Sequence, residues 1–86
     1  MANLENNSAD TRTFVQFCAS LTKRQWVDLH ADIVAKIKRS PQCVYKWKTG
    51  VTFPSSVTER VKISEIINRK FNLATRHWTL FPDPQL

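Results

Sequence analysis

Residues 40–50 read SPQCVYKWKTG and contain the start and stop signals of one short helix. Ser40 can cap the helix through its hydroxyl, and Pro41 suits the first helical position because the N–H that it lacks would have no partner there. Gly50, the only glycine of the chain, stands where a residue in the left-handed conformation ends a helix. The segment therefore predicts a helix from Pro41 to Thr49.

The predicted helix has two chemically different faces. Val44 and Trp47 lie three positions apart and share the face that we expect to be buried. The opposite face carries an amide, which can pair with adenine, and an ammonium, which can reach the acceptors of guanine. For so short a segment, a merely solvated face is the simpler interpretation, so the choice depends on the rest of the chain. The outward residues are Pro41, Gln42, Tyr45 and Lys46.

The basic residues of the chain gather around this helix. Thirteen lysines and arginines against seven acids give a net charge of +6. No acid occurs between Asp32 and Glu59. A mild excess of basic charge can serve solubility alone, but a basic segment centred on a two-faced helix favours a polyanionic partner. The cations expected to neutralise phosphates are Lys36, Lys38, Arg39, Lys46 and Lys48.

The chain before residue 40 predicts two helices. Asp10 is expected to cap the first, which begins at residue 10 or 11 and ends at about residue 20. Thr22 and Gln25 have the spacing of a capping box and predict a long helix that ends at about Lys38. Because only two residues would then separate the long helix from the short basic one, the pair has the form of a helix-turn-helix.

The chain after residue 50 predicts a loop and one more long helix. Ser56 and Glu59 repeat the capping-box spacing and open a helix that ends at about Phe71. The sequence thus predicts an all-α fold, a compact bundle of about four helices that contains a helix-turn-helix. We expect a disordered arm at residues 1–9, a helix-turn-helix domain at residues 10–74 and a C-terminal extension at residues 75–86.

The C-terminal extension contains three large apolar residues, Trp78, Leu80 and Phe81. Such side chains are too apolar to remain in water without a partner. We expect them to dock on the core, and burial against a second copy of the chain, as a homodimer contact, is the alternative.

Several classes of protein do not fit the sequence. The spacing of Cys18, His30, Cys43 and His77 matches no zinc pattern, and neither a catalytic constellation nor a glycine-rich phosphate loop is visible. We expect no metal, no cofactor, no small-molecule ligand and no enzymatic activity. The apolar runs are too short for a membrane span and residues 1–10 lack the layout of a signal peptide, so we expect a soluble, cytoplasmic protein.

The segment from Ile33 to Pro54 resembles the phage lambda repressor-like helix-turn-helix family. The resemblance is carried by Ile33 and Ile37 on the long helix, the Ser40 cap, the inward Val44 and Trp47, the Thr-Gly ending and the proline shortly after it. In that family the short helix enters the major groove of DNA and its N-terminal residues read bases.

The resemblance implies roles for individual residues. The outward positions Pro41, Gln42, Tyr45 and Lys46 would read base edges, and Ser40, Lys48, Thr49 and Thr52 would face phosphates. Pro41 departs from the family because it has no N–H to donate to a base. Lys38 stands where the family often has glycine, which implies a different turn geometry.

Two functions remain open at this point. The first is sequence-specific binding of double-stranded DNA by a small transcriptional regulator or a phage or mobile-element repressor, with residues 41–49 in the major groove. The second is a protein-interaction adaptor that keeps the same fold and binds another polypeptide through the tail around Trp78 and Phe81.

Overall fold

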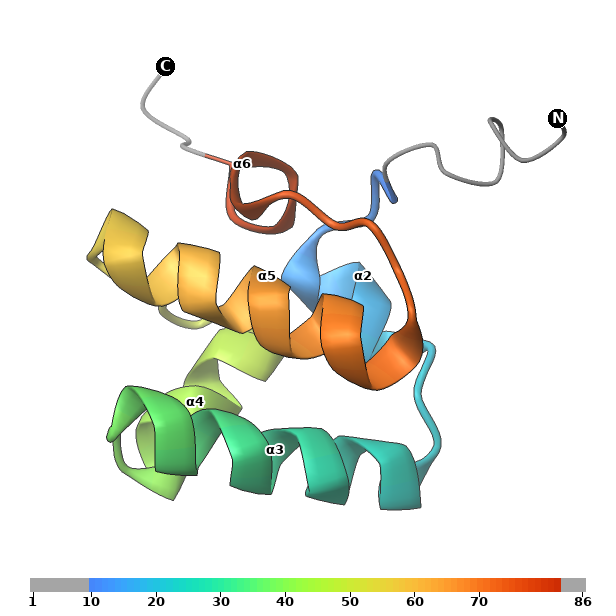
Figure 1. Cartoon of the computed structure of the whole chain (residues 1–86). Coiled ribbons are helices and arrows are strands. Elements are labelled where there is room, and N and C mark those ends of the chain that lie inside the picture. The colour runs from blue at the N-terminus through green and yellow to red at the C-terminus, as the bar shows by residue number, and fades with distance from the viewer. Residues whose placement is uncertain (1–9, 83–86) are drawn as a thin grey trace, which may run out of the picture.

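The computed structural model describes residues 10–82, which contain five helices (Figure 1). They are α2 (Phe14–Ala19), α3 (Lys23–Ile37), α4 (Pro41–Thr49), α5 (Val57–Phe71) and α6 (His77–Leu80). The only extended pairing among the described residues is an isolated parallel bridge between Asp10 and Thr75. The prediction of an all-α fold is confirmed. The predicted arm at residues 1–9 lies outside the described residues.

The start of α2 differs from the prediction. Thr13, not Asp10, caps this helix: the Thr13 hydroxyl accepts a hydrogen bond from the Gln16 backbone N–H, and the Gln16 side chain accepts one from the Thr13 N–H. The Asp10 carboxylate instead pairs with the Arg12 guanidinium at 2.7 Å. The hydrogen bond from Arg12 lowers the pKa of Asp10. Asp10 therefore stabilises the segment before α2 and does not cap the helix.

The long helix α3 begins as predicted and ends in a left-handed residue. Thr22 and Gln25 form the reciprocal capping box. Lys38 follows the last helical residue with φ 62° and ψ 43°, a conformation that glycine adopts without steric cost. Lys38 therefore adopts the left-handed conformation that a glycine would favour at this turn. The sequence had predicted a different turn geometry, because lysine stands there in place of glycine.

The ends of α4 are those that the sequence predicted. The Ser40 hydroxyl accepts a hydrogen bond from the Cys43 N–H, and Pro41 is the first helical residue. Gly50 has φ 81° and its N–H donates to the Lys46 and Trp47 carbonyls. Its ideal Cβ would lie 3.3 Å from a methyl carbon of Val15, so both the backbone conformation and the close approach of α2 favour glycine.

The predicted capping box of α5 is only half formed. Ser56 accepts a hydrogen bond from the Glu59 N–H, as expected. The Glu59 carboxylate, however, does not return to the Ser56 N–H but accepts a hydrogen bond from Arg39 Nε at 2.7 Å. A tertiary partner has replaced the local one.

The helices pack around one apolar core, and Figure 1 shows their arrangement. Helix α3 packs against α4 and α5, α2 packs against α4, and α6 packs on α5. Ion pairs join Arg39 to Glu59 and Asp32 to Lys70, so α3 and α5 lie side by side and run in opposite directions. The buried apolar residues are Phe14, Phe17, Cys18, Leu29, Ile33, Val44, Trp47, Ile63, Ile67, Leu80 and Phe81.

The C-terminal residues divide between core and solvent. Leu80 and Phe81 are buried, and the Phe81 ring lies 5.2 Å from the Phe14 ring, centroid to centroid. Trp78 is 58% exposed, so the expectation that it docks on the core is wrong. Its position follows from the short helix α6, because a residue two positions before Leu80 points to a different side of a helix.

Neither a membrane-spanning helix nor a cluster of metal ligands occurs among residues 10–82. None of the five helices is long and apolar enough to cross a membrane, and no three His, Cys, Asp or Glu side chains in this range gather as a metal ion would need. Cys18 and Cys43 are free thiols, the first buried and the second half-buried. Burial raises the pKa of the Cys18 thiol to about 12, so this side chain is a small apolar group of the core.

Candidate nucleic-acid interface

Helix α4 is anchored by one face and exposes the other. Val44 is fully buried and Trp47 is 2% exposed, which fixes how far the helix can rotate about its axis. Because of this anchoring, Gln42, Tyr45 and Lys46 are exposed along with Pro41. The structure thus places all four predicted base-reading residues on one free surface.

An aromatic and cationic cluster borders this surface. The Lys48 ammonium nitrogen lies 5.3 Å from the ring centroid of Trp26 and 5.6 Å from that of Tyr45. Trp26 in turn stacks on His30, with centroids 4.8 Å apart and an interplanar angle of 24°. A cation held between two aromatic faces is attracted by both ring quadrupoles. We call Trp26, His30, Tyr45 and Lys48 the aromatic–cationic cluster.

His30 connects α3 directly to the start of α4. Its Nε2 lies 2.9 Å from the Pro41 carbonyl oxygen, so the ring donates a hydrogen bond there from the tautomer that carries the proton on Nε2. This contact complements the packing of Val44 and Trp47, because it holds the first turn of α4 while they hold its middle and end. Base-reading residues of this kind of helix lie near its first turn.

The sequence did not single out Trp26 or His30 as part of this surface. The sequence pattern placed Trp26 in the apolar stripe of α3 and indicated for His30 only a surface or core position. Their spacing of four places them next to each other on one helix face, and that face lies at the boundary between the core and α4. A partly polar aromatic pair at the edge of an apolar stripe is the signal that could have identified them.

The hydroxyl groups predicted to contact phosphates differ in whether their proton is free to donate a hydrogen bond. The Thr49 hydroxyl donates to the Lys46 carbonyl at 3.2 Å. Ser40 uses its oxygen as an acceptor for the Cys43 N–H and keeps its own proton, and Thr52 is exposed in the loop after α4. Ser40 and Thr52 are therefore better placed than Thr49 to donate to a phosphate oxygen.

Arg39 is exposed but has a partner. Its Nε donates to Glu59, and this hydrogen bond raises the pKa of Arg39. Residues 33–58 contain no acid, but the fold places Glu59 next to Arg39. The ion pair therefore neutralises one of the five cations of this interval. Lys38, one residue earlier, is exposed and forms no ion pair with the described residues.

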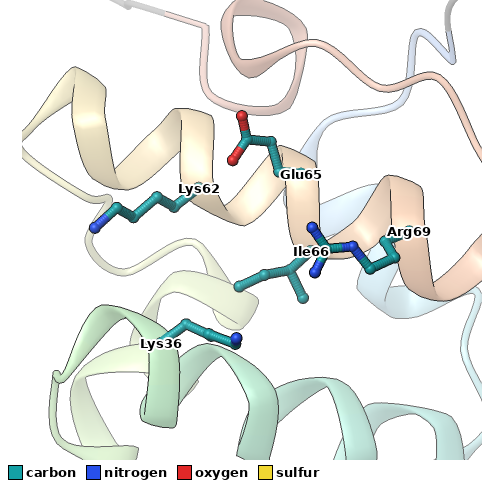
Figure 2. A pocket seen from close by; sticks show the side chains of 5 residues that line it. All are labelled: Lys36, Lys62, Glu65, Ile66 and Arg69. Atoms are coloured by element: carbon teal, nitrogen blue, oxygen red, sulfur yellow. The ribbon is translucent and has the colours of Figure 1, made fainter.

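Lys36 does not lie with the other predicted cations. Figure 2 shows its side chain in a hollow between α3 and α5, together with Lys62 and Arg69 from α5. His30 and Trp26, by contrast, occupy the flank of α3 that faces α4. The structure therefore exposes Lys46 on α4, directs Lys48 of the same helix toward Trp26, adds Lys38 at the turn, and places Lys36 on a different side of α3.

The arrangement is suited to binding, through donors and cations on a convex helix. Amide, phenol and ammonium groups can donate hydrogen bonds to base edges and phosphates. Comparisons of the chain with protein-family models, with curated proteins and with solved structures find no match. The functional assignment therefore depends on the residues and the geometry of this surface.

Proposed function

We propose that α3 and α4 form a helix-turn-helix of the lambda repressor-like type, and that the protein binds double-stranded DNA in a sequence-specific way. It would act as a small transcriptional regulator or as a phage or mobile-element repressor. The observation that carries the proposal is that α4 is anchored by one face only. Val44 and Trp47 are buried, while Gln42, Tyr45 and Lys46 are exposed on the opposite side.

The geometry of the two helices supports this function. Three residues, 38–40, separate α3 from α4, and the left-handed Lys38 makes the turn tight. A helix of nine residues, Pro41–Thr49, is about 13 Å long at 1.5 Å per residue. The major groove of B-DNA, about 12 Å wide, admits one α-helix, whose diameter with side chains is about 10–12 Å. The C-terminal residues Leu80 and Phe81 would complete the domain by docking on it.

The residues of α4 would have separate roles. Gln42 would pair with an adenine edge, Lys46 would reach guanine acceptors, and Tyr45 would contact a neighbouring base or sugar. Lys38, Lys48, Ser40 and Thr52 would contact phosphates and set the register without reading sequence. Pro41, which has no N–H, would contribute only an apolar contact, such as one with a thymine methyl group.

The test is fluorescence anisotropy of a labelled random duplex over a series of salt concentrations, followed by selection of bound duplexes from a randomised pool. We expect affinity to fall steeply with salt, because each phosphate contact contributes about −0.9 to the slope of log K against log salt. We also expect the selected pool to be enriched in one motif.

Two matched pairs of variants make the test specific. Gln42→Ala should reduce discrimination at one base pair by about 1–3 kcal/mol, whereas Gln25→Ala, which removes half of the capping box at the start of α3, should lower stability but leave discrimination unchanged. Lys46→Ala should weaken binding more than Lys62→Ala, since both are exposed lysines but only Lys46 is on α4. Absence of binding at low salt, or equal effects within each pair, would refute the proposal.

A second function is favoured by one observation, the 58% exposure of Trp78. Trp78 would anchor another polypeptide, or a second copy of this chain, by burying its ring in the contact. A dimer that binds DNA through both copies would place its two α4 helices about 34 Å apart. Such a contact should survive high salt, because screening weakens phosphate binding far more than apolar burial.

A further inference from the structure

The seam between α3 and α5 is closed at both ends and hollow in the middle. At one end Arg39 pairs with Glu59 at 2.7 Å, and at the other Lys70 pairs with Asp32 at 2.8 Å. Between the two ion pairs lies a hollow of about 220 Å³ (Figure 2). Its lining residues are Lys36, Lys62, Glu65, Ile66 and Arg69.

The hollow has an excess of positive charge. Lys36, Lys62 and Arg69 are exposed, and none of them forms an ion pair with another described residue. Figure 2 shows Lys36 and Arg69 beside the Ile66 side chain, whereas the carboxylate of Glu65 points away from them. Asp32 and Glu59 are held in the ion pairs at the ends, and Glu65 is the one acid that lines the hollow, so three cations face one carboxylate there.

The floor of the hollow is apolar. Ile66 is partly buried and packs against the core from α5, and one side of it faces the hollow. Cations placed around a partly exposed aliphatic side chain match a ligand that has carboxylates beside an apolar residue. We propose that this seam binds an acidic amphipathic segment of another protein, with its carboxylates on Lys36 and Arg69 and an aliphatic side chain on Ile66.

The observations favour a polypeptide over nucleic acid at this seam. A sugar–phosphate backbone could use the cations, but its sugar carbons lie next to oxygens and it has no hydrocarbon side chain to cover Ile66. The distance along α3 from Asp32 to its last residue, Ile37, is about 8 Å, which matches about one and a half turns of a helix. Helices with apolar and charged residues at steps of three and four commonly lie in grooves of this kind.

The seam is separate from the proposed DNA surface. Lys36 is on the flank of α3 that faces α5, whereas Trp26 and His30 are on the flank that faces α4. The inference therefore goes beyond the proposed function and does not depend on it. A partner at the seam would leave α4 free to bind a duplex at the same time.

The test uses a synthetic helical peptide of about 14 residues, roughly 20 Å long, with leucine at every third or fourth position and glutamate between. The peptide is titrated into the ¹⁵N-labelled full chain, and amide shifts are followed by NMR. We expect the largest shifts at the lining residues of the seam. A scrambled peptide of the same composition should bind at least about fivefold more weakly, because its leucines no longer share one face.

Matched double variants test the assignment of the cations. In Lys36→Gln with Arg69→Gln we expect peptide affinity to fall about tenfold, in line with two exposed charge pairs. In Lys23→Gln with Arg24→Gln, which removes the same charge from the start of α3, we expect less than about a twofold change. Circular dichroism of each variant verifies that the helices are retained.

Four outcomes would overturn the proposal. They are no peptide binding at about 1 mM, shifts that map to another surface, equal loss in the two double variants, and equal binding of the scrambled peptide. A fifth outcome would reassign the seam to nucleic acid: a random duplex would lose more affinity than the peptide when Lys36 and Arg69 are changed. Because the peptide assay contains no DNA, its result is distinguishable from failure of the proposed function.

Discussion

Arg39 donates a 2.7 Å hydrogen bond from Nε to the carboxylate of Glu59, twenty residues later in the chain. The pair joins the turn before α4 to the first turn of α5. It also neutralises a cation that would otherwise be free beside the proposed DNA surface. A cation in an exposed ion pair gives up little stability when it changes partner, because such pairs contribute about 0–1 kcal/mol.

Release of Arg39 should strengthen DNA binding. In Glu59→Gln we expect tighter binding of a random duplex at low salt and a salt slope steeper by about 0.9, which corresponds to one more phosphate contact. The matched control is Asp32→Asn, which also raises the net charge by one but frees Lys70 at the far end of the seam. Equal steepening in both variants would mean that Arg39 is not near the duplex.

Lys48 and Trp26 should be energetically coupled. In urea unfolding of Trp26→Leu, Lys48→Met and the double variant, we expect a coupling energy of about 0.5–1 kcal/mol, typical of a cation over an aromatic face. The control cycle combines Trp26→Leu with Lys46→Met, because no cation–π contact of Lys46 with Trp26 occurs in the structure. A coupling of zero in the first cycle would contradict the cluster geometry.

Lys38 is a site where glycine should stabilise the fold. A residue with a Cβ in the left-handed region costs about 1–2 kcal/mol, and glycine loses part of that gain through the greater entropy of its unfolded state. We expect Lys38→Gly to raise the free energy of unfolding by roughly 0.5–1 kcal/mol. Asn72, with φ 57°, is the control, since asparagine tolerates this conformation and Asn72→Gly should gain less. Destabilisation by Lys38→Gly in urea titrations would contradict the expectation.

The buried thiol of Cys18 predicts a loss of stability at high pH. Its pKa is raised to about 12 in the folded state from an ordinary value of 9.0. Above pH 9 the unfolded chain releases this proton and the folded chain does not, so the contribution to stability falls as pH rises. Between pH 9 and pH 10.5 we expect the difference in unfolding free energy between the wild type and Cys18→Ala to shrink by roughly 1–2 kcal/mol. A constant difference over this range would show that the thiol is accessible to water.

Two aromatic residues of the C-terminal segment should behave in opposite ways. Phe81→Ala should lower the free energy of unfolding by about 3 kcal/mol or more, because Phe81 is 2% exposed and its removal leaves a cavity. Trp78→Ala should change it by no more than about 0.5 kcal/mol. If Trp78 forms a contact between two copies, sedimentation velocity should show a larger species in the wild type that Trp78→Ala lacks. A large loss of stability in monomeric Trp78→Ala would contradict the exposed position.

The candidate surface was predictable where its determinants are close together in the sequence. Ser40 and Gly50 mark the ends of α4 through hydrogen bonds that span three or four residues, and the spacing of Val44 and Trp47 sets its buried face. The exposure of Gln42, Tyr45 and Lys46 follows from that spacing. The extension of the surface onto α3 was indicated only by the spacing of Trp26 and His30, since the contact of Lys48 with Trp26 depends on how two helices cross.

The all-α fold, the caps of α3 and α4 and the two faces of α4 follow from local sequence, because capping and periodicity depend on groups within about one helical turn. The tertiary structure decided which charges stay free. It brought Glu59 to Arg39, set Lys36 on the seam with α5, held Lys48 between Trp26 and Tyr45, and left Trp78 exposed beside a buried Phe81. The pairings of Arg39 with Glu59, of Lys36 with α5 and of Lys48 with Trp26 depend on how the helices pack, because no local sequence pattern encodes a distance between groups that are twenty or more residues apart.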